Sequence, residues 1–143
     1  MPTHIDFYVL KRSGSDSLRF ACRLTEKAYN AGHRIYIDTV DTEQAQYLDE
    51  LLWTFSDTSF VPHRRIAAAG QGPEPVAIGH GCPPDDSADV LLTLQPDAPE
   101  YFTRFGRVLE FVHGDPQQQS SARQRYRFYQ GRGVRIETHQ IDE

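Results

Sequence analysis

The side chains best suited to binding chemistry lie in an expected helix at residues 115–130, which begins with an Asp-Pro pair. Asp caps helix N-termini and Pro fits the first turn. Gln119, Arg123 and Tyr126 follow at spacings of four and three residues, so they share one face. A guanidinium beside an aromatic ring suits a peptide that ends in a carboxylate. Arginine would bind the charge, while the ring and Val112 would contact an apolar side chain.

The charge distribution supports a peptide ligand over a duplex. The net charge is −5, which argues against a protein that mainly binds phosphate backbones through surplus Lys and Arg. Residues 104–135 nevertheless contain seven arginines and two acidic residues, so this segment carries +5 and the remainder −10. A basic surface on an acidic body suits an acidic peptide better than a duplex, because the acidic remainder of the molecule would repel a long polyanion. The alternative is a solvated arginine-rich face without a partner.

Sequence signatures of enzymatic chemistry are missing. There is no Gly-x-x-x-x-Gly-Lys-Ser/Thr loop, and the segment 11–15 lacks the glycine spacing that a dinucleotide requires. His80 and Cys82 offer two soft ligands, whereas a structural zinc site needs four. Asp85 and Asp86 stand in a polar, proline-flanked loop where solvation is expected. We therefore expect no catalytic residue, no cofactor and no metal.

A second candidate surface combines a helix end with the segment after it. The apolar residues of 48–55 recur at three- and four-residue spacing, and Trp53 stands beside that stripe. Phe60 follows in a segment where Pro62 pushes the preceding residue toward extended geometry. An apolar ring displayed on a loop is typical of an interface anchor. Burial of Trp53 and Phe60 in the core is the alternative.

The groups described above must be positioned by strands and helices, and the pattern of these elements predicts one α/β domain over residues 1–143. Strands are expected at 4–10, 34–38, 75–78, 88–94, 107–112 and 134–136, and helices at about 16–30, 42–55 and 115–130, with 96–105 as loop. Asp16 or Ser17 would cap the first helix and Thr42 the second. Strand–helix–strand order implies parallel pairing. We predict a three-layer α/β/α fold with a largely parallel mixed sheet, Rossmann-like without a phosphate-binding loop.

The sequence also sets an expectation about location. It has no run of 18 apolar residues and no hydrophobic signal region after Met1, so we expect a cytoplasmic protein without a membrane segment. Cys22 and Cys82 are then expected to be free thiols.

Several segments resemble one known family. Leu48–Trp53 followed by Ser59–His63 resembles the hallmark of the chi subunit of bacterial DNA polymerase III, an accessory protein of the clamp loader. Further stretches resemble the same family at matching spacing, namely 72–78, 89–94, 108–112 and 122–129. The resemblance therefore covers nearly the whole chain.

The resemblance implies a non-catalytic subunit that bridges the clamp loader and single-stranded DNA-binding protein. The surface for the psi subunit would comprise Trp53, Phe60, Pro62 and His63. The site for the C-terminal tail of single-stranded DNA-binding protein would comprise Val112, Gln119, Arg123, Tyr126 and Arg127. The resemblance also implies a helicase that competes for the psi surface, and no direct sequence-specific binding of nucleic acid.

One residue departs from the family pattern. Gln119 is uncharged where the family leads us to expect a basic residue, so tail binding would be weaker or shifted to Arg127 or Arg104. Two other functions stay open at this point. One is a nucleotide-binding α/β enzyme, and the other is direct binding of single-stranded DNA by the arginine-rich helix.

Overall fold

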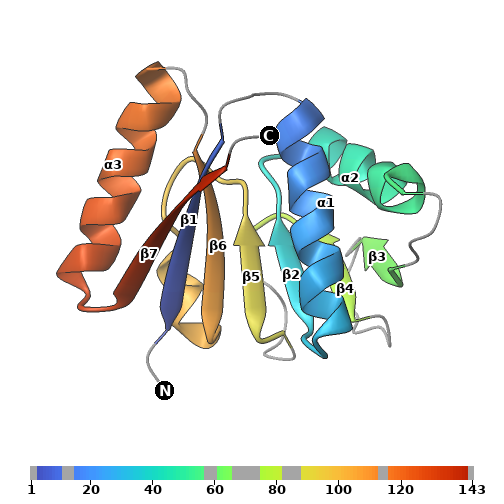
Figure 1. Ribbon diagram of the computed structural model, residues 1–143, viewed down its shortest axis with the longest axis horizontal. Helices are drawn as coiled ribbons and strands as arrows, with labels where there is room; N and C mark the ends of the chain where they lie inside the picture. Colours follow the sequence, from blue (N-terminus) through green and yellow to red (C-terminus); the bar gives the residue numbers. More distant parts are fainter. Residues whose placement is uncertain are drawn as a thin grey trace.

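The structure is a computed structural model that describes residues 3–10, 15–56, 61–65, 75–81, 88–112 and 116–141. These residues form a seven-stranded sheet with helices on both faces (Figure 1). The strands are β1 (His4–Leu10), β2 (Ile35–Asp38), β3 (His63–Arg65), β4 (Val76–Gly79), β5 (Val90–Thr93), β6 (Arg107–Val112) and β7 (Arg135–Ile141). The helices are α1 (Ser15–Asn30), α2 (Thr42–Thr54), α3 (Pro116–Gly131) and a 3-10 helix, η1 (Glu100–Arg104).

The strand order explains the layers. The order is β3-β4-β2-β5-β6-β1-β7, and every pairing between the described strands is parallel. The connections through α1 and α2 run toward the β3 edge, whereas those through η1 and α3 run toward the β7 edge. Right-handed crossovers in opposite directions place their helices on opposite faces. The predicted three-layer α/β/α fold is confirmed, but the expected mixed sheet is wrong because these pairs are all parallel.

Two apolar cores lie on either side of the sheet. One lies under α1 and α2, and the other under η1 and α3. Strand β5 contributes to both, because Val90 and Leu92 face the first core and Leu91 faces the second. All four residues of β5 are buried, as predicted for a central strand. No helix within the described ranges has both the length and the apolar character to span a membrane.

Some element boundaries differ from the sequence prediction. The N-cap of α2 is Asp41, whose Oδ1 accepts a hydrogen bond of 2.8 Å from the Gln44 N–H, so Thr42 is the first helical residue and not the cap. Helix α1 begins at Ser15, which places the expected caps Asp16 and Ser17 inside its first turn. The segment expected to be loop contains η1, and β3 was not predicted.

A buried polar network fixes α3 to the sheet. Glu110 of β6 is fully buried, and Arg125 Nε donates to its Oε1 at 2.8 Å while the Tyr129 hydroxyl donates to its Oε2 at 2.5 Å. Arg125 Nη2 also donates to the Phe111 carbonyl at 3.1 Å. Arg125 is only 4% exposed, so the expectation that it belongs to a basic surface is wrong. Its charge instead compensates a carboxylate inside the protein.

This network makes stability depend on pH. Burial raises the pKa of Glu110 to about 7 from its ordinary value of 4.5, against the lowering effects of Arg125 and Tyr129. The folded protein therefore binds this proton more tightly than the unfolded chain. The stability that Glu110 contributes is full below pH 4.5 and is lost as the pH rises through about 7.

Replacing Arg125 with Met should raise the pKa of Glu110 further, because the neighbouring positive charge is gone. The variant should then lose more stability at high pH than the wild type does. We expect Arg125→Met to be less stable by about 3 to 5 kcal/mol near pH 8, the usual cost of breaking a buried ion pair, and by less near pH 6. Urea unfolding at both pH values measures the difference. Arg123→Met, on an exposed face of the same helix, is the control. An equal loss at both pH values would show that Glu110 is not linked to Arg125.

Candidate functional site

A groove of about 240 Å³ lies between α3 and the β1, β6 and β7 strands. Its lining consists of Phe7, Val9, Val112, Gln119, Ala122, Arg123, Tyr126 and Thr138, and we call it the α3 groove. Four of the five residues predicted to bind a peptide tail line it, namely Val112, Gln119, Arg123 and Tyr126. Four residues that the sequence assigned to one site therefore line one concave surface.

The floor of the α3 groove follows from strand register. Val9 of β1 pairs with Val112 of β6, and Phe7 pairs with Thr138 of β7, so these side chains face the same side of the sheet. The Phe7 ring lies 5.7 Å from the Tyr126 ring, measured between centroids. Because the floor is mainly apolar, an apolar side chain of a ligand would be shielded there from water.

The rim of the α3 groove carries the charge. Arg123 is exposed, and Tyr126 is 39% exposed beside it. Arg127 is exposed as well, but it does not line the groove because it is one residue further round the helix. An arginine at the rim of an apolar groove can bind a carboxylate while the floor holds the adjoining side chain.

Sequence reasoning missed the contributions of β1 and β7 to this groove. Phe7, Val9 and Thr138 lie far from α3 in the sequence and reach it only through the order β6-β1-β7. Strand alternation places Phe7 and Val9 on one face of β1, but the sequence does not indicate which helix covers that face.

The second predicted surface is partly described. Trp53, in the last turn of α2, is 50% exposed, which excludes full burial of this ring in the core. Pro62 is half-buried, and Phe60 lies outside the described residues. Trp53 is therefore an accessible aromatic side chain, and its contact with His63 places it at the β3 edge of the sheet.

The buried His63 side chain packs against Trp53. The His63 side chain is fully buried, and its ring lies 4.4 Å from the Trp53 ring between centroids. Its Nδ1 and Nε2 lie 2.6 and 2.9 Å from the carbonyl oxygens of Val61 and Asp49. A side chain held in this way cannot contact a partner directly. His63 was expected to form part of the surface, but its burial leaves it the role of positioning Trp53.

The carboxyl edge between β2 and β5 is the place where α/β folds often bind ligands, because connections leave it in opposite directions. A pocket of about 390 Å³ lies there, lined by residues that include Gln44, Gln95 and Arg125. The nearby carboxylate of Asp38 accepts hydrogen bonds from the Gly81 N–H, the Gln95 amide and the Tyr101 hydroxyl. Asp38 and Arg125 are thus both engaged in internal hydrogen bonds.

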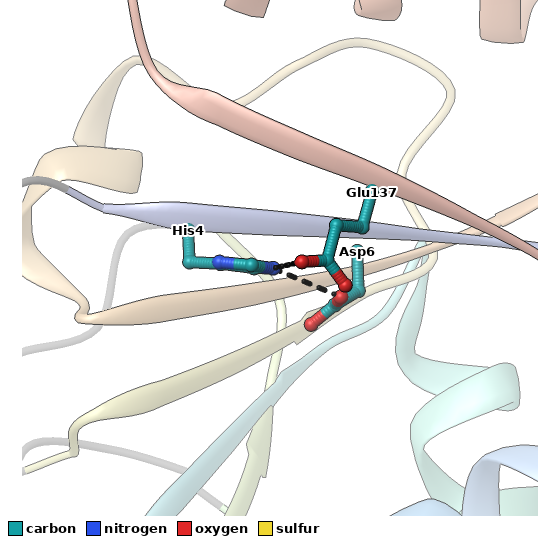
Figure 2. A group of neighbouring side chains, drawn as sticks. All are labelled: His4, Asp6 and Glu137. Carbon is teal, nitrogen blue, oxygen red and sulfur yellow. Dashed lines mark hydrogen bonds and ion pairs between the residues drawn. The ribbon is translucent and has the colours of Figure 1, made fainter.

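Groups able to bind a metal lie on the opposite face of β1 and β7 from the groove. His4, Asp6 and Glu137 place donor atoms within 4.8 Å of one another (Figure 2). The sequence pair His80 and Cys82 cannot be compared with them, because Cys82 lies outside the described residues.

Comparisons with known proteins identify the family of the chain. The family model described as DNA polymerase III chi subunit, HolC, matches residues 1–137. DNA polymerase III subunit chi of Pseudomonas aeruginosa is 37% identical over 140 residues, which is 97% of each chain. The corresponding protein of Escherichia coli is 31% identical over 121 residues, covering 84% of this chain and 82% of its own length.

The Haemophilus influenzae protein of the same name is 28% identical, over 94% of this chain and 95% of its own length. Among solved structures, the C-terminal domain of the DEAD-box protein Dbp5 is similar with a TM-score of 0.68, covering 98% of this chain and 91% of that domain. Its sequence is only 12% identical, so this likeness concerns the fold alone.

Proposed function

Because the chain belongs to the chi subunit family of DNA polymerase III, we propose that it bridges the clamp loader and single-stranded DNA-binding protein without catalysing a reaction. In this proposal the psi subunit docks around Trp53, and the C-terminal tail of single-stranded DNA-binding protein binds in the α3 groove. The observation that carries the proposal is the α3 groove itself, with its apolar floor and its arginine at the rim.

The α3 groove suits the end of a peptide chain. A terminal apolar side chain would lie against Phe7, Val112 and Tyr126, and burying it contributes about 1.5 to 3 kcal/mol. The terminal carboxylate would then lie near the Arg123 guanidinium, which binds carboxylates through paired hydrogen bonds. Gln119 lines the groove without adding charge, so Arg123 supplies the positive charge of the lining.

Acidic residues upstream of the tail's end would contribute less to affinity. They would lie in solvent near exposed arginines such as Arg127, where an ion pair is worth about 0 to 1 kcal/mol. Such charges mainly raise the association rate, and salt reduces that gain. Discrimination therefore rests on the last residue of the tail.

The charges of the described residues favour a peptide over bare single-stranded DNA. Arg125 is buried against Glu110, Arg107 Nη1 lies 3.1 Å from Asp6 Oδ2, and Arg135 Nη2 lies 3.0 Å from Glu137 Oε1. Three of the seven arginines of the basic segment are thus offset by carboxylates. A stripe of arginines for a phosphate backbone is correspondingly weaker than the sequence suggests.

The Trp53 surface is the proposed contact for psi, and a competing helicase would use the same surface. Trp53 is half-exposed, and tryptophan is one of the side chains enriched at the energetic centres of interfaces. Its support by His63 holds the ring in one orientation before a partner arrives.

Truncation of Arg123 tests the tail site. Arg123→Ala should weaken binding of a fluorescent acidic tail peptide by about 1.5 to 3 kcal/mol, the range for a hydrogen bond to a charged group. Arg127→Ala is the matched control, because it removes a neighbouring exposed arginine outside the groove, and it should cost no more than about 1 kcal/mol. Equal affinities of wild type and Arg123→Ala would remove Arg123 from the site.

Truncation of the peptide tests the mechanism. Deleting the final apolar residue of the tail should cost about 1.5 to 3 kcal/mol, whereas neutralising one upstream acid should cost about 0 to 1 kcal/mol. Both peptides are titrated at low and moderate salt beside single-stranded DNA of similar charge. If the truncated peptide binds as well as the full tail, or if the DNA displaces both, the helix is a general polyanion surface.

Substitution of Trp53 tests the bridge. An immobilised tail peptide should retain psi only in the presence of this chain, and Trp53→Ala should abolish that retention while tail affinity stays unchanged. Its stability should fall by only about 0.5 to 1.5 kcal/mol, the worth of a ring contact, whereas Leu52→Ala in the core should cost about 2 to 5 kcal/mol. Retention of psi by a folded Trp53→Ala variant would place the psi surface elsewhere.

A further inference from the structure

A cluster of imidazole and carboxylate groups lies on the face of β1 and β7 that α3 does not cover. Parallel register pairs Asp6 with Glu137 and Tyr8 with His139, while His4 precedes Asp6 by two residues on the same side of β1. Figure 2 shows the His4 ring and the Glu137 side chain converging on Asp6. Sheet order thus assembles these groups from the two ends of the sequence.

The donor atoms of this cluster are spaced like metal ligands. His4 Nε2 lies 3.1 Å from Asp6 Oδ1 and 3.8 Å from Glu137 Oε1. His139 Nε2 lies 2.9 Å from the same Asp6 oxygen. Ligands of a tetrahedral zinc ion, each at about 2.0 to 2.2 Å from the metal, are separated by about 3.4 Å. The ligand atoms of His4, Asp6 and Glu137 all lie within 4.8 Å of one another, so these three residues could enclose an ion after small side-chain movements.

Asp6 gives a second, independent indication of a ligand. Its side chain is 1% exposed, yet its Oδ2 receives no hydrogen bond from any group in the described part of the chain. Arg107 Nη1 lies 3.1 Å away but outside hydrogen-bonding geometry, so it offsets the charge without satisfying the oxygen directionally. The charge of this oxygen is offset, but its hydrogen-bonding capacity is unfilled, which is costly for a buried polar atom and leaves a lone pair that a metal ion could bind.

We propose that this cluster is a binding site for a zinc-class divalent transition metal, with His4, Asp6 and Glu137 as ligands and His139, which contacts Asp6, as a fourth ligand once its side chain turns toward the other three. Two imidazoles and two carboxylates form a donor set that suits Zn²⁺ and is too rich in nitrogen for Mg²⁺ or Ca²⁺. The side chains of His4, Glu137 and His139 are 18%, 42% and 37% exposed, so an ion can reach the site from solvent.

Without a metal, two arginines offset the charges of the carboxylates in the cluster. Arg107 approaches Asp6, and Arg135 approaches Glu137 at 3.0 Å. Their side chains are 52% and 75% exposed, so both can turn into solvent when a metal binds. The site would then exchange two flexible ion pairs for coordination that ties the edge strand β7 to β1.

Titration of the full chain without an affinity tag tests the proposal. After treatment with a chelator and desalting, the protein should bind one equivalent of Zn²⁺ by calorimetry, and its melting temperature should rise. Mg²⁺ should produce neither effect. His4→Ala and Glu137→Gln should each weaken Zn²⁺ binding at least tenfold, while their melting temperatures without metal stay near that of the wild type.

His33→Ala is the matched control, because His33 forms an exposed pair with Asp89, 2.5 Å apart, away from the cluster. This variant should bind Zn²⁺ like the wild type. The proposal is overturned if the wild type binds no stoichiometric Zn²⁺, if the double variant His4→Ala with Glu137→Gln still binds it, or if His33→Ala removes it.

Discussion

The buried network of Glu110, Arg125 and Tyr129 is the constraint on which the rest of the binding architecture depends. It joins one side of α3 to β6, and the α3 groove exists only because the helix is held at a fixed height above the sheet. A buried ion pair stabilises a fold less than a well-packed apolar contact does, but it tolerates few alternative arrangements. Helix α3, which buries Ala122, Arg125 and Tyr129, is thereby held in one rotation about its axis.

The sequence predicted the local elements well and the roles of individual charges less well. Apolar stripes located α1 and α2, the Asp-Pro pair located the start of α3, and β-rich or continuous apolar runs located β1, β5 and β6, because all of these are local signals in the sequence. Arg123 and Arg125 stand two residues apart on one helix and look equivalent in the sequence. Only the sheet position of Glu110 decides that Arg125 is buried and Arg123 is exposed. The burial of His63 was not predicted either, since it depends on the unpredicted strand β3.

The groups that lay beyond sequence reasoning come from pairings between distant strands. Asp6 and His139 are 133 residues apart, and Phe7 and Thr138 are almost as distant, yet β1 and β7 are neighbours. Strand alternation divides β1 between two surfaces. His4 and Asp6 face the proposed metal site, while Phe7 and Val9 form the floor of the α3 groove. Phe60, one of the four residues predicted to form the psi surface, lies outside the described residues and stays a prediction.

The order of the strands has a geometric consequence for two partners bound together. Trp53 rests on His63 of β3, the strand at one edge, and the α3 groove includes Thr138 of β7, the strand at the other (Figure 1). Six inter-strand spacings separate these edges, which amounts to about 29 Å. Partners held at the two ends would not collide, and tension between them would be transmitted across the hydrogen-bonded sheet. The domain would then act as a stiff spacer, whose length is set by the number of its strands.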